Sequence, residues 1–293
     1  MTTLAPVAAV TGASGYLGSR ICTTLGSRGW QVVRLARGAS RSHRPACAYD
    51  LAMPVTAEVT GVLRSADVLV HAAYDLSLTS AADIWRVNVE GTRRLLEVAN
   101  DARVRRILVL SSMSAFDGTS QLYGRAKLDI EAMTMESGGC AVRPGLVHGE
   151  RFGGMAAALR KLTRLPIVPV IVGGGGLYTV CEDDLMTAIA ALAAAETLAP
   201  GTISVAHPTP VILPDLLATF AAQEDRRCRL VPVPWHLVYC LLRTAEILRL
   251  RLPFRADSLL GLVRTASCVS DGGQLAQLGI NLHAFPLKRV DQG

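Results

Sequence analysis

Apolar and polar residues alternate along the first half of the chain in blocks that predict strands and helices in turn. Short runs that are apolar almost throughout are typical of strands buried on both faces. Longer stretches with helical spacing follow them. The predicted strands are 7–10, 31–35, 67–72, 106–111 and 140–143, and the predicted helices are 16–28, 81–102 and 123–136.

This order predicts an α/β fold with a doubly wound parallel sheet, a Rossmann-type domain, over residues 1–150. The pattern loosens in residues 151–293, where prolines cluster and helices are predicted near 183–197, 214–223 and 235–250. We expect this second part to be smaller, α-rich and mostly substrate-binding. Some of its segments are expected to return to the sheet of the first part.

Composition narrows the class of protein. Half of the residues are hydrophobic and 18% are charged, which excludes a disordered chain. Aromatic residues make up only 5%, which argues against a single-strand nucleic-acid binder. The seven cysteines are scattered and form no CxxC pair, so we expect neither a disulfide framework nor a metal site. With no signal peptide and no spanning segment predicted, we expect a cytoplasmic protein.

Positive charge is concentrated in residues 226–264, which hold eight arginines against Glu246 and Asp257. That excess equals the whole formal net charge of +6. A solvated surface explains it most simply; an acidic substrate and an anionic membrane surface are the sharper alternatives. The mostly apolar helix at 235–250 favours a core or subunit interface over a membrane-facing role. A homodimer and peripheral membrane contact therefore stay open.

A glycine-rich loop joins the first predicted strand to the first helix, with Gly12, Gly15 and Gly18 three positions apart. In a dinucleotide-binding loop, such glycines allow a tight turn, approach of backbone to a pyrophosphate, and close packing of the helix on the sheet. The helix N-terminus then offers free N–H groups to the phosphates. The alternative is an ordinary strand-to-helix turn.

A Tyr–Lys pair lies on the helix predicted at 123–136, with Tyr123 and Lys127 on one face. A nearby ammonium and the positive ring of a bound dinucleotide both favour the phenolate, so we expect them together to lower the pKa of Tyr123 and fit it for acid–base catalysis. Ser112 ends the preceding strand, where ligands of open sheets collect. Ser111 and Ser114 are its rivals, and a solvated Tyr–Lys pair without chemistry is the plainer interpretation.

Several features, taken in chain order, resemble the short-chain dehydrogenase/reductase superfamily. They are the spacing of Gly12, Gly15 and Gly18, the segments at 67–73 and 88–92, the Ser-Ser strand end, and the segments at 143–145 and 182–185. The similarity is to its extended, epimerase/dehydratase-like branch. It implies that Ser112, Tyr123 and Lys127 are catalytic, and that the lysine also holds the nicotinamide ribose. The interval between Ser112 and Tyr123 is short for that branch.

The resemblance also implies a cofactor site. Apart from Arg37, its predicted residues are Gly12, Ser14, Gly15, Tyr16, Leu17, Gly18, Asp50, Leu51, Ala72, Ala73, Tyr123 and Lys127. It suggests a structural or water-relay role for Asn88; a capping or buried amide role is the alternative. His71 is expected to be a core histidine without chemistry.

The end of the second predicted strand favours NADP over NAD, although NAD stays open. An NAD-selective site places an acidic residue about 20 positions beyond the glycine loop. That place falls at Ala36, and Arg37 follows at once, with Arg34, Arg41 and Arg44 close by. A guanidinium suits a 2′-phosphate.

We therefore expect an NAD(P)-dependent oxidoreductase that acts on a secondary alcohol or ketone of a small molecule, with Tyr123 as acid or base. A nucleotide-sugar epimerase or dehydratase with tightly bound NAD(P) is one alternative. Residues 173–180 contain no Arg or Lys for a diphosphate, which weakens it. A non-catalytic dinucleotide-binding scaffold or sensor is the other, although a pure binder needs neither Tyr123 nor Lys127.

Overall fold

The computed structural model describes residues 5–38, 46–149, 153–172, 175–248, 250, 256–263 and 273–287. Several residues singled out in the sequence lie outside these ranges. They are Arg41, Arg44, Gly173, Gly174, Arg249, Arg251, Arg255, Arg264 and Cys268.

A parallel sheet of seven strands forms the centre of the first part, which confirms the predicted fold class. Its spatial order is β10-β6-β5-β4-β1-β2-β3. Val10 in β1 pairs with Arg34 of β2 on one side and Val70 of β4 on the other. The strands are β1 (Val7–Thr11), β2 (Gln31–Ala36), β3 (Ala46–Ala48), β4 (Val68–His71), β5 (Arg106–Leu110), β6 (Cys140–Pro144) and β10 (Gly201–Val205).

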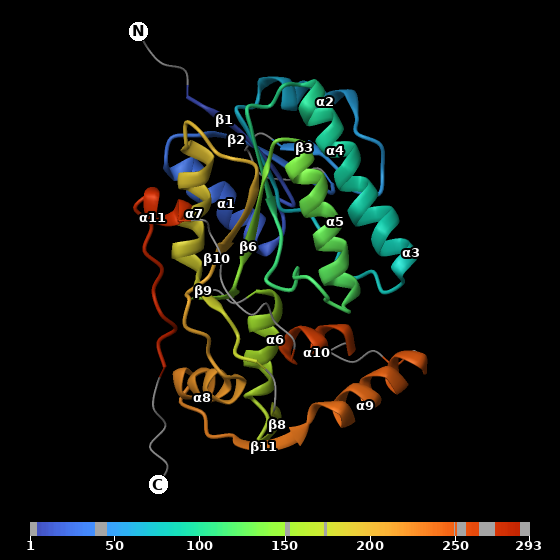
Figure 1. Ribbon diagram of the computed structural model, residues 1–293, viewed down its shortest axis with the longest axis vertical. Coiled ribbons are helices and arrows are strands. Elements are labelled where there is room, and N and C mark those ends of the chain that lie inside the picture. The colour runs from blue at the N-terminus through green and yellow to red at the C-terminus, as the bar shows by residue number, and fades with distance from the viewer. Residues whose placement is uncertain are drawn as a thin grey trace.

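Helices cover both faces of this sheet (Figure 1). On one face, α1 (Tyr16–Ser27), α7 (Glu182–Ala194) and the short α11 (Gln274–Gln277) bury apolar side chains such as Leu25 and Leu185. On the other lie α2 (Ala57–Ser65), α4 (Glu90–Asp101) and α5 (Leu122–Glu136). Apolar burial on two faces explains why the central strands are hydrophobic throughout.

The single helix predicted at 81–102 is interrupted in its winding. α3 (Ala81–Ile84) runs into a π-helical turn, η1 (Trp85–Val89), which continues as α4. π-turns occur mostly as short bulges inside helices, frequently at functional sites. This one contains Asn88, a residue of the candidate site.

The second part contains more strand than the sequence predicts. Two small parallel pairs join β8 (Ile167–Val172) to β11 (Arg229–Pro234) and β7 (Leu146–His148) to β9 (Thr179–Cys181). β8 and β11 were not predicted because both contain proline, which is tolerated in strands only where its missing N–H is not needed. The remaining helices are α6 (Gly154–Leu162), α8 (Leu213–Gln223), α9 (Trp235–Ile247) and α10 (Ala256–Val263).

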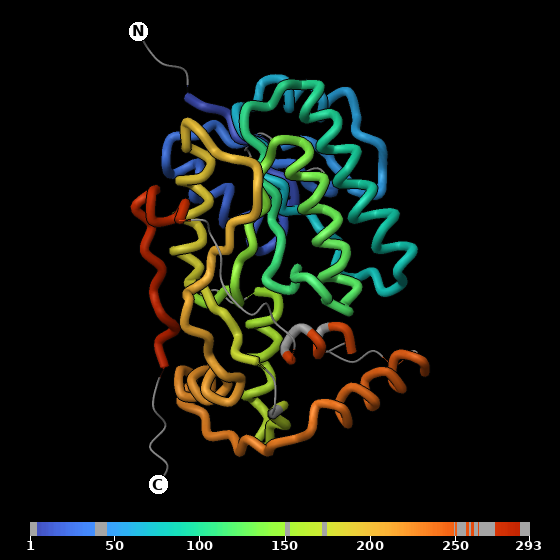
Figure 2. Tube along the Cα trace, viewed as in Figure 1, coloured from blue at the N-terminus to red at the C-terminus, as the bar shows by residue number. Residues whose placement is uncertain are grey.

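Figure 2 follows the chain through both parts: the segment at 201–205 returns to the central sheet, and the chain then runs to α8, β11 and α9 at the far end of the molecule. Among the helices of the described ranges, none has the length and apolar character needed to cross a membrane.

Candidate active site

The loop between β1 and α1 has close approaches that exclude a side chain. Gly12 has a left-handed backbone with φ of +64°, and a Cβ there would lie 2.8 Å from the carbonyl carbon of Ala72. A Cβ on Gly18 would overlap the carbonyl oxygen of Gly12, so α1 packs directly on the loop. The Gly15 amide donates to the same oxygen over 2.8 Å. The N-terminus of α1 therefore lies close to the backbone that follows β4.

Thr11, the last residue of β1, ties the ends of two neighbouring strands together. Its hydroxyl accepts hydrogen bonds from the amides of Ala72 and Ala73 at 3.1 and 3.2 Å. The same oxygen lies 2.7 Å from Nδ1 of His71. Sequence reasoning gave Thr11 no role, because its partners are distant in the chain. Its bonds hold Ala72 and Ala73 beside the glycine loop.

His71 is a buried, neutral link in this arrangement. Its Nε2 lies 2.9 Å from the Thr92 hydroxyl, which itself donates to the Asn88 carbonyl at 2.6 Å. The network therefore assigns the ring proton to Nε2, with Nδ1 accepting from Thr11. Burial, followed by the charge of Lys127, lowers the pKa of His71 to about 3. The expectation of a core histidine is confirmed.

The Asn88 side chain holds the segment that follows β4. Its Oδ1 accepts from the amide of Asp75 at 2.7 Å, and its Nδ2 donates to the carbonyl of the same residue at 3.2 Å. Asn88 is fully buried. Asn88 is therefore a buried amide that holds a loop in place, which is one of the roles expected for it.

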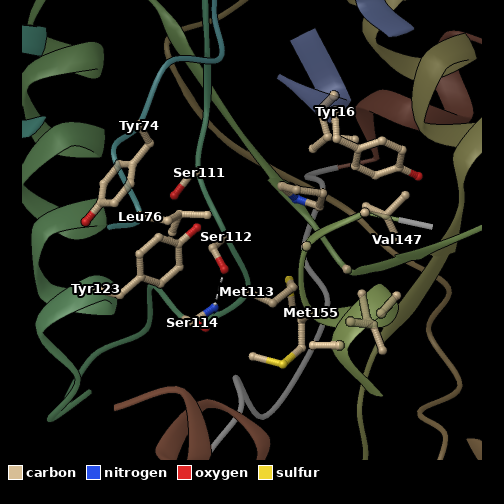
Figure 3. Close-up of a pocket in the computed structure, with 18 of the residues that line it drawn as sticks. Tyr16, Tyr74, Leu76, Ser111, Ser112, Met113, Ser114, Tyr123, Val147 and Met155 are labelled. Carbon is tan, nitrogen blue, oxygen red and sulfur yellow. Dashed lines mark hydrogen bonds between the residues drawn. The ribbon is translucent and has the colours of Figure 1, made fainter. Parts of the chain in front are cut away.

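Tyr123 and Ser112 meet beyond the carboxyl end of β5. Figure 3 shows the Tyr123 hydroxyl pointing toward Ser112, whose own hydroxyl accepts from the Ser114 amide at 3.1 Å. Burial raises the pKa of Tyr123, and its hydrogen bond with Ser112 acts in the opposite direction. The rival Ser111 donates its hydroxyl to Glu131. The structure therefore brings Ser112 and Tyr123 together, while their catalytic roles stay predictions.

Lys127 lies one helical turn beyond Tyr123, in the interior. Its Nζ donates to the Leu110 carbonyl at 2.6 Å and lies 4.5 Å from the ring centroid of Tyr74. Burial lowers the pKa of Lys127 to about 7, and Glu131 partly offsets this. In this structure desolvation is the largest influence on both groups and favours their neutral forms, so the pKa of Tyr123 is raised and Lys127 alone does not lower it.

Glu131 is a residue that sequence reasoning missed. It accepts from Nε and Nη2 of Arg143 at 2.7 and 2.5 Å, a two-pronged pair that joins α5 to β6. The signal was present, since Tyr123, Lys127 and Glu131 follow one another at intervals of four and share a helix face. Glu131 therefore fastens the helix that carries Tyr123 and Lys127 to the central sheet.

Lys127 should make stability rise with pH near neutrality. The unfolded chain keeps its proton up to about pH 10.5, whereas the folded chain releases it near pH 7. Because the unfolded state then binds more protons, the free energy of unfolding increases with pH above 7. We expect the Tm to rise between pH 7 and about 8.5, below the ordinary range of thiol titration. Thermal unfolding followed by circular dichroism checks this.

Lys127→Met should flatten that slope, and Lys161→Met, which removes an exposed lysine, should leave it as in the wild type. An equal slope in wild type and Lys127→Met would show that Lys127 is not desolvated.

A pocket of about 450 Å³ opens in front of Ser112 and Tyr123. Its walls are mostly apolar and come from both parts of the chain (Figure 3). Leu76, Met113 and Val147 belong to the first part, and Met155 belongs to the second. Among the described residues that line it, the charged side chains are Asp75 and Asp257.

Asp257, on α10, also completes the start of α5. Its carboxylate accepts from the amides of Leu122 and Tyr123 at 2.9 and 3.4 Å. A carboxylate at a helix N-terminus satisfies free amides and suits the helix dipole. The helix that carries Tyr123 is thus capped by a residue from far along the sequence.

The predicted cofactor residues that follow β2 and β3 do not line the pocket. Arg37 has a largely exposed side chain whose Nη1 lies 3.3 Å from Oδ2 of Asp75. Asp50 accepts from the Ala52 amide in a turn, and the Leu51 carbonyl accepts from Arg94, each at 2.9 Å. Their part in cofactor binding stays a prediction.

The sequence model of the NAD dependent epimerase/dehydratase family matches residues 8–158, which is more than half of the chain. The chain belongs to this family. This confirms the branch that the sequence motifs resemble.

Curated relatives include two reductases. The chain is 30% identical over 202 residues to 4-hydroxy-2-methyl-3-oxo-4-farnesyl-3,4-dihydroquinoline-1-oxide ketoreductase of Stigmatella aurantiaca, covering 59% of this chain and 60% of the relative. It is 28% identical over 174 residues to ceramide reductase of Caulobacter vibrioides, covering 56% of this chain and 54% of the relative. The matches thus span little more than half the length of these relatives.

Solved structures share the fold. An epimerase from Methanothermobacter thermautotrophicus superposes with a TM-score of 0.73 at 15% identity, covering 96% of this chain and 89% of that one.

The site of this epimerase/dehydratase family member suits a nicotinamide dinucleotide. A Cβ at Gly12 or Gly18 would occupy space that the loop needs, and the loop leads into the N-terminus of α1. Such a cradle of backbone amides fits a pyrophosphate. Ala72 and Ala73 adjoin it. Lys127 is buried with its Nζ bonded to the Leu110 carbonyl, so its part in holding a ribose stays a prediction. The residues present therefore fit NAD(P).

Proposed function

We propose that the chain is an NAD(P)-dependent oxidoreductase acting on the hydroxyl-bearing or keto carbon of a bulky, uncharged and largely apolar substrate. One observation carries this proposal: Ser112 and Tyr123, which lie together, face an apolar pocket whose charged lining side chains, among the described residues, are both acidic. A diphosphate-bearing sugar would need cations there. The nucleotide-sugar alternative therefore has less support.

The names of the curated relatives agree with this substrate class. A farnesyl-bearing quinoline and a ceramide are both molecules with long apolar chains. A pocket with apolar walls and a few convergent polar groups is what such a ligand requires.

The chain's own residues would position the substrate oxygen and move its proton. The Ser112 hydroxyl, oriented by the Ser114 amide, holds the oxygen beside the Tyr123 phenol. Tyr123 donates a proton to that oxygen during reduction and removes it during oxidation. We expect protonated Lys127 and the positive ring of a bound dinucleotide together to favour the phenolate of Tyr123. Gly12, Gly15 and Gly18 hold the dinucleotide, which supplies the hydride chemistry when bound.

A substrate screen followed at 340 nm tests the proposal. We expect net turnover of NADPH with long-chain or polycyclic ketones and none with nucleotide sugars. Conversion of a nucleotide sugar without net change at 340 nm would instead identify an epimerase, and cofactor binding without any turnover would identify a scaffold or sensor.

We expect tighter binding of NADPH than of NADH. The exposed guanidinium of Arg37 can pair with a 2′-phosphate, and the position where NAD-selective sites have an acid is Ala36. Nη1 of Arg37 lies 3.3 Å from one carboxylate oxygen of Asp75. This ion pair is long and one-pronged, so the guanidinium can exchange it for a phosphate. Dissociation constants for both cofactors, measured by calorimetry, check this.

Arg37→Ala should weaken NADPH binding about tenfold and leave NADH unchanged, since a charge-assisted hydrogen bond contributes roughly 1.5–3 kcal/mol. NADH binding as tightly as NADPH in the wild type would refute the preference. Arg28→Ala, on the far end of α1, is the control for removal of a surface arginine.

A further inference from the structure

Helix α9 has two apolar faces, and only one of them is buried. Leu242 and Ala245 are buried, and Leu242 packs with Ala256 and Leu259 of α10. The opposite face is exposed, and we name it the α9 stripe. Its residues are Leu237, Cys240, Leu241, Thr244, Ile247 and Leu248.

The α9 stripe is a continuous surface rather than scattered side chains. Its members recur at intervals of three and four, which places them on one side of the helix. Leu241 is 67% exposed and Ile247 is 75% exposed, so large apolar side chains face solvent. A contiguous exposed apolar patch marks an interaction surface.

Figures 1 and 2 show α9 projecting from the molecule at the end formed by β8 and β11. Residues just before and at the start of β8 add to the exposed apolar surface at this end. Leu165 and Ile167 are 48% and 58% exposed, and Ile167 pairs with Arg229 of β11.

Cations accompany this apolar surface. Segments 160–167 and 224–248 hold seven arginine or lysine residues and three acidic ones. Glu224 is engaged by Arg160 and Arg226, and Glu246 by Arg243. Arg164, Arg227 and Arg229 are exposed. The last two lie before and at the start of β11, the strand that leads into α9, so one end of the molecule carries both exposed cations and the apolar stripe. That combination suits a surface of opposite charge with an apolar interior.

We propose that the α9 stripe docks this chain on an anionic lipid bilayer, with the helix lying in the interface. The apolar side chains enter the acyl boundary and the arginines contact lipid phosphates. A symmetric pair of chains fits the surface less well, because a two-fold interface would bring like-charged arginine clusters together.

Docking at this place would bring the pocket close to the membrane. α10 packs on α9, and Asp257 of α10 lines the pocket. A lipid-like substrate could then enter from the bilayer. That last step rests on the proposed function, whereas binding to lipid does not.

Vesicle flotation of the full chain tests the docking without substrate or cofactor. We expect the wild type to float with vesicles of phosphatidylcholine and phosphatidylglycerol, and to remain unbound with phosphatidylcholine alone or in high salt. Leu237→Gln combined with Leu241→Gln should reduce the bound fraction about tenfold, because two leucines lose their apolar burial. Arg227→Gln combined with Arg229→Gln should reduce it on anionic vesicles by weakening the contact with lipid phosphates.

Met135→Gln, which changes an exposed apolar residue on α5, is the matched control and should bind as the wild type does. Unchanged thermal unfolding in every variant excludes loss of fold. Absence of wild-type binding to anionic vesicles, or equal binding by the leucine variant, overturns the proposal. A dimer in light scattering that the leucine variant dissolves, without vesicle binding, would assign the stripe to a second copy. Because no activity is measured, failure here leaves the proposed function standing.

Discussion

Tyr123→Phe should lower turnover by about 10²–10⁴-fold, the usual effect of removing a positioned acid or base. The substitution keeps the ring that packs edge-on against Tyr74 and deletes only the hydroxyl that faces Ser112. The fold should survive because the change removes one atom from a buried site. Dinucleotide affinity should stay nearly constant, since the glycine loop is untouched. Initial rates at 340 nm and calorimetric titration with NADPH measure the two quantities separately.

Tyr239→Phe is the matched control, because it removes a tyrosine hydroxyl on α9, outside the pocket lining. It should retain wild-type turnover. Full activity in Tyr123→Phe, with any substrate found, would remove Tyr123 from the proposed chemistry.

Gly15→Val should abolish dinucleotide binding while the chain still folds. Gly15 precedes the first turn of α1 with an extended backbone (φ −78°) that valine also adopts. Its Cβ would lie 3.2 Å from the Gly12 carbonyl oxygen, so a small local shift accommodates it. The branched side chain would then stand where backbone amides must approach a pyrophosphate. Displacement of a bound group by about 1 Å can cost about 10²-fold.

Gly26→Val tests the same chemical change on the same helix, because nothing lies within 4 Å of a Cβ at Gly26. We expect it to bind NADPH as the wild type does. Unaltered NADPH affinity in a folded Gly15→Val protein would mean that the loop is only a structural turn.

The central sheet was predictable because its strands are buried on both faces and leave long apolar runs. Val68–His71 and Arg106–Leu110 are examples, and both lie in the predicted strands. The strands of the second part were not predictable in this way. β11 reads Arg-Leu-Val-Pro-Val-Pro and is half exposed, so neither continuous hydrophobicity nor alternation marks it.

The site was predictable where spacing along one element defines it. Tyr123 and Lys127 share a helix face, and Gly12, Gly15 and Gly18 share a loop. Contacts between distant segments were not predictable, such as Thr11 with Ala72 and Ala73. The direction of the Tyr123 pKa was also missed, since spacing shows a nearby charge and says nothing of burial.

The cap that Asp257 supplies to α5 affects how the enzyme is made. Translation yields the strand end with Ser112 and the helix with Tyr123 long before it yields α10. A nascent chain can therefore assemble the central sheet and its glycine loop while the first turn of α5 still lacks the carboxylate that accepts from the Leu122 and Tyr123 amides. Tyr123 thus reaches its final setting late in synthesis, and a chain released before α10 would carry the glycine loop with the start of α5 still uncapped.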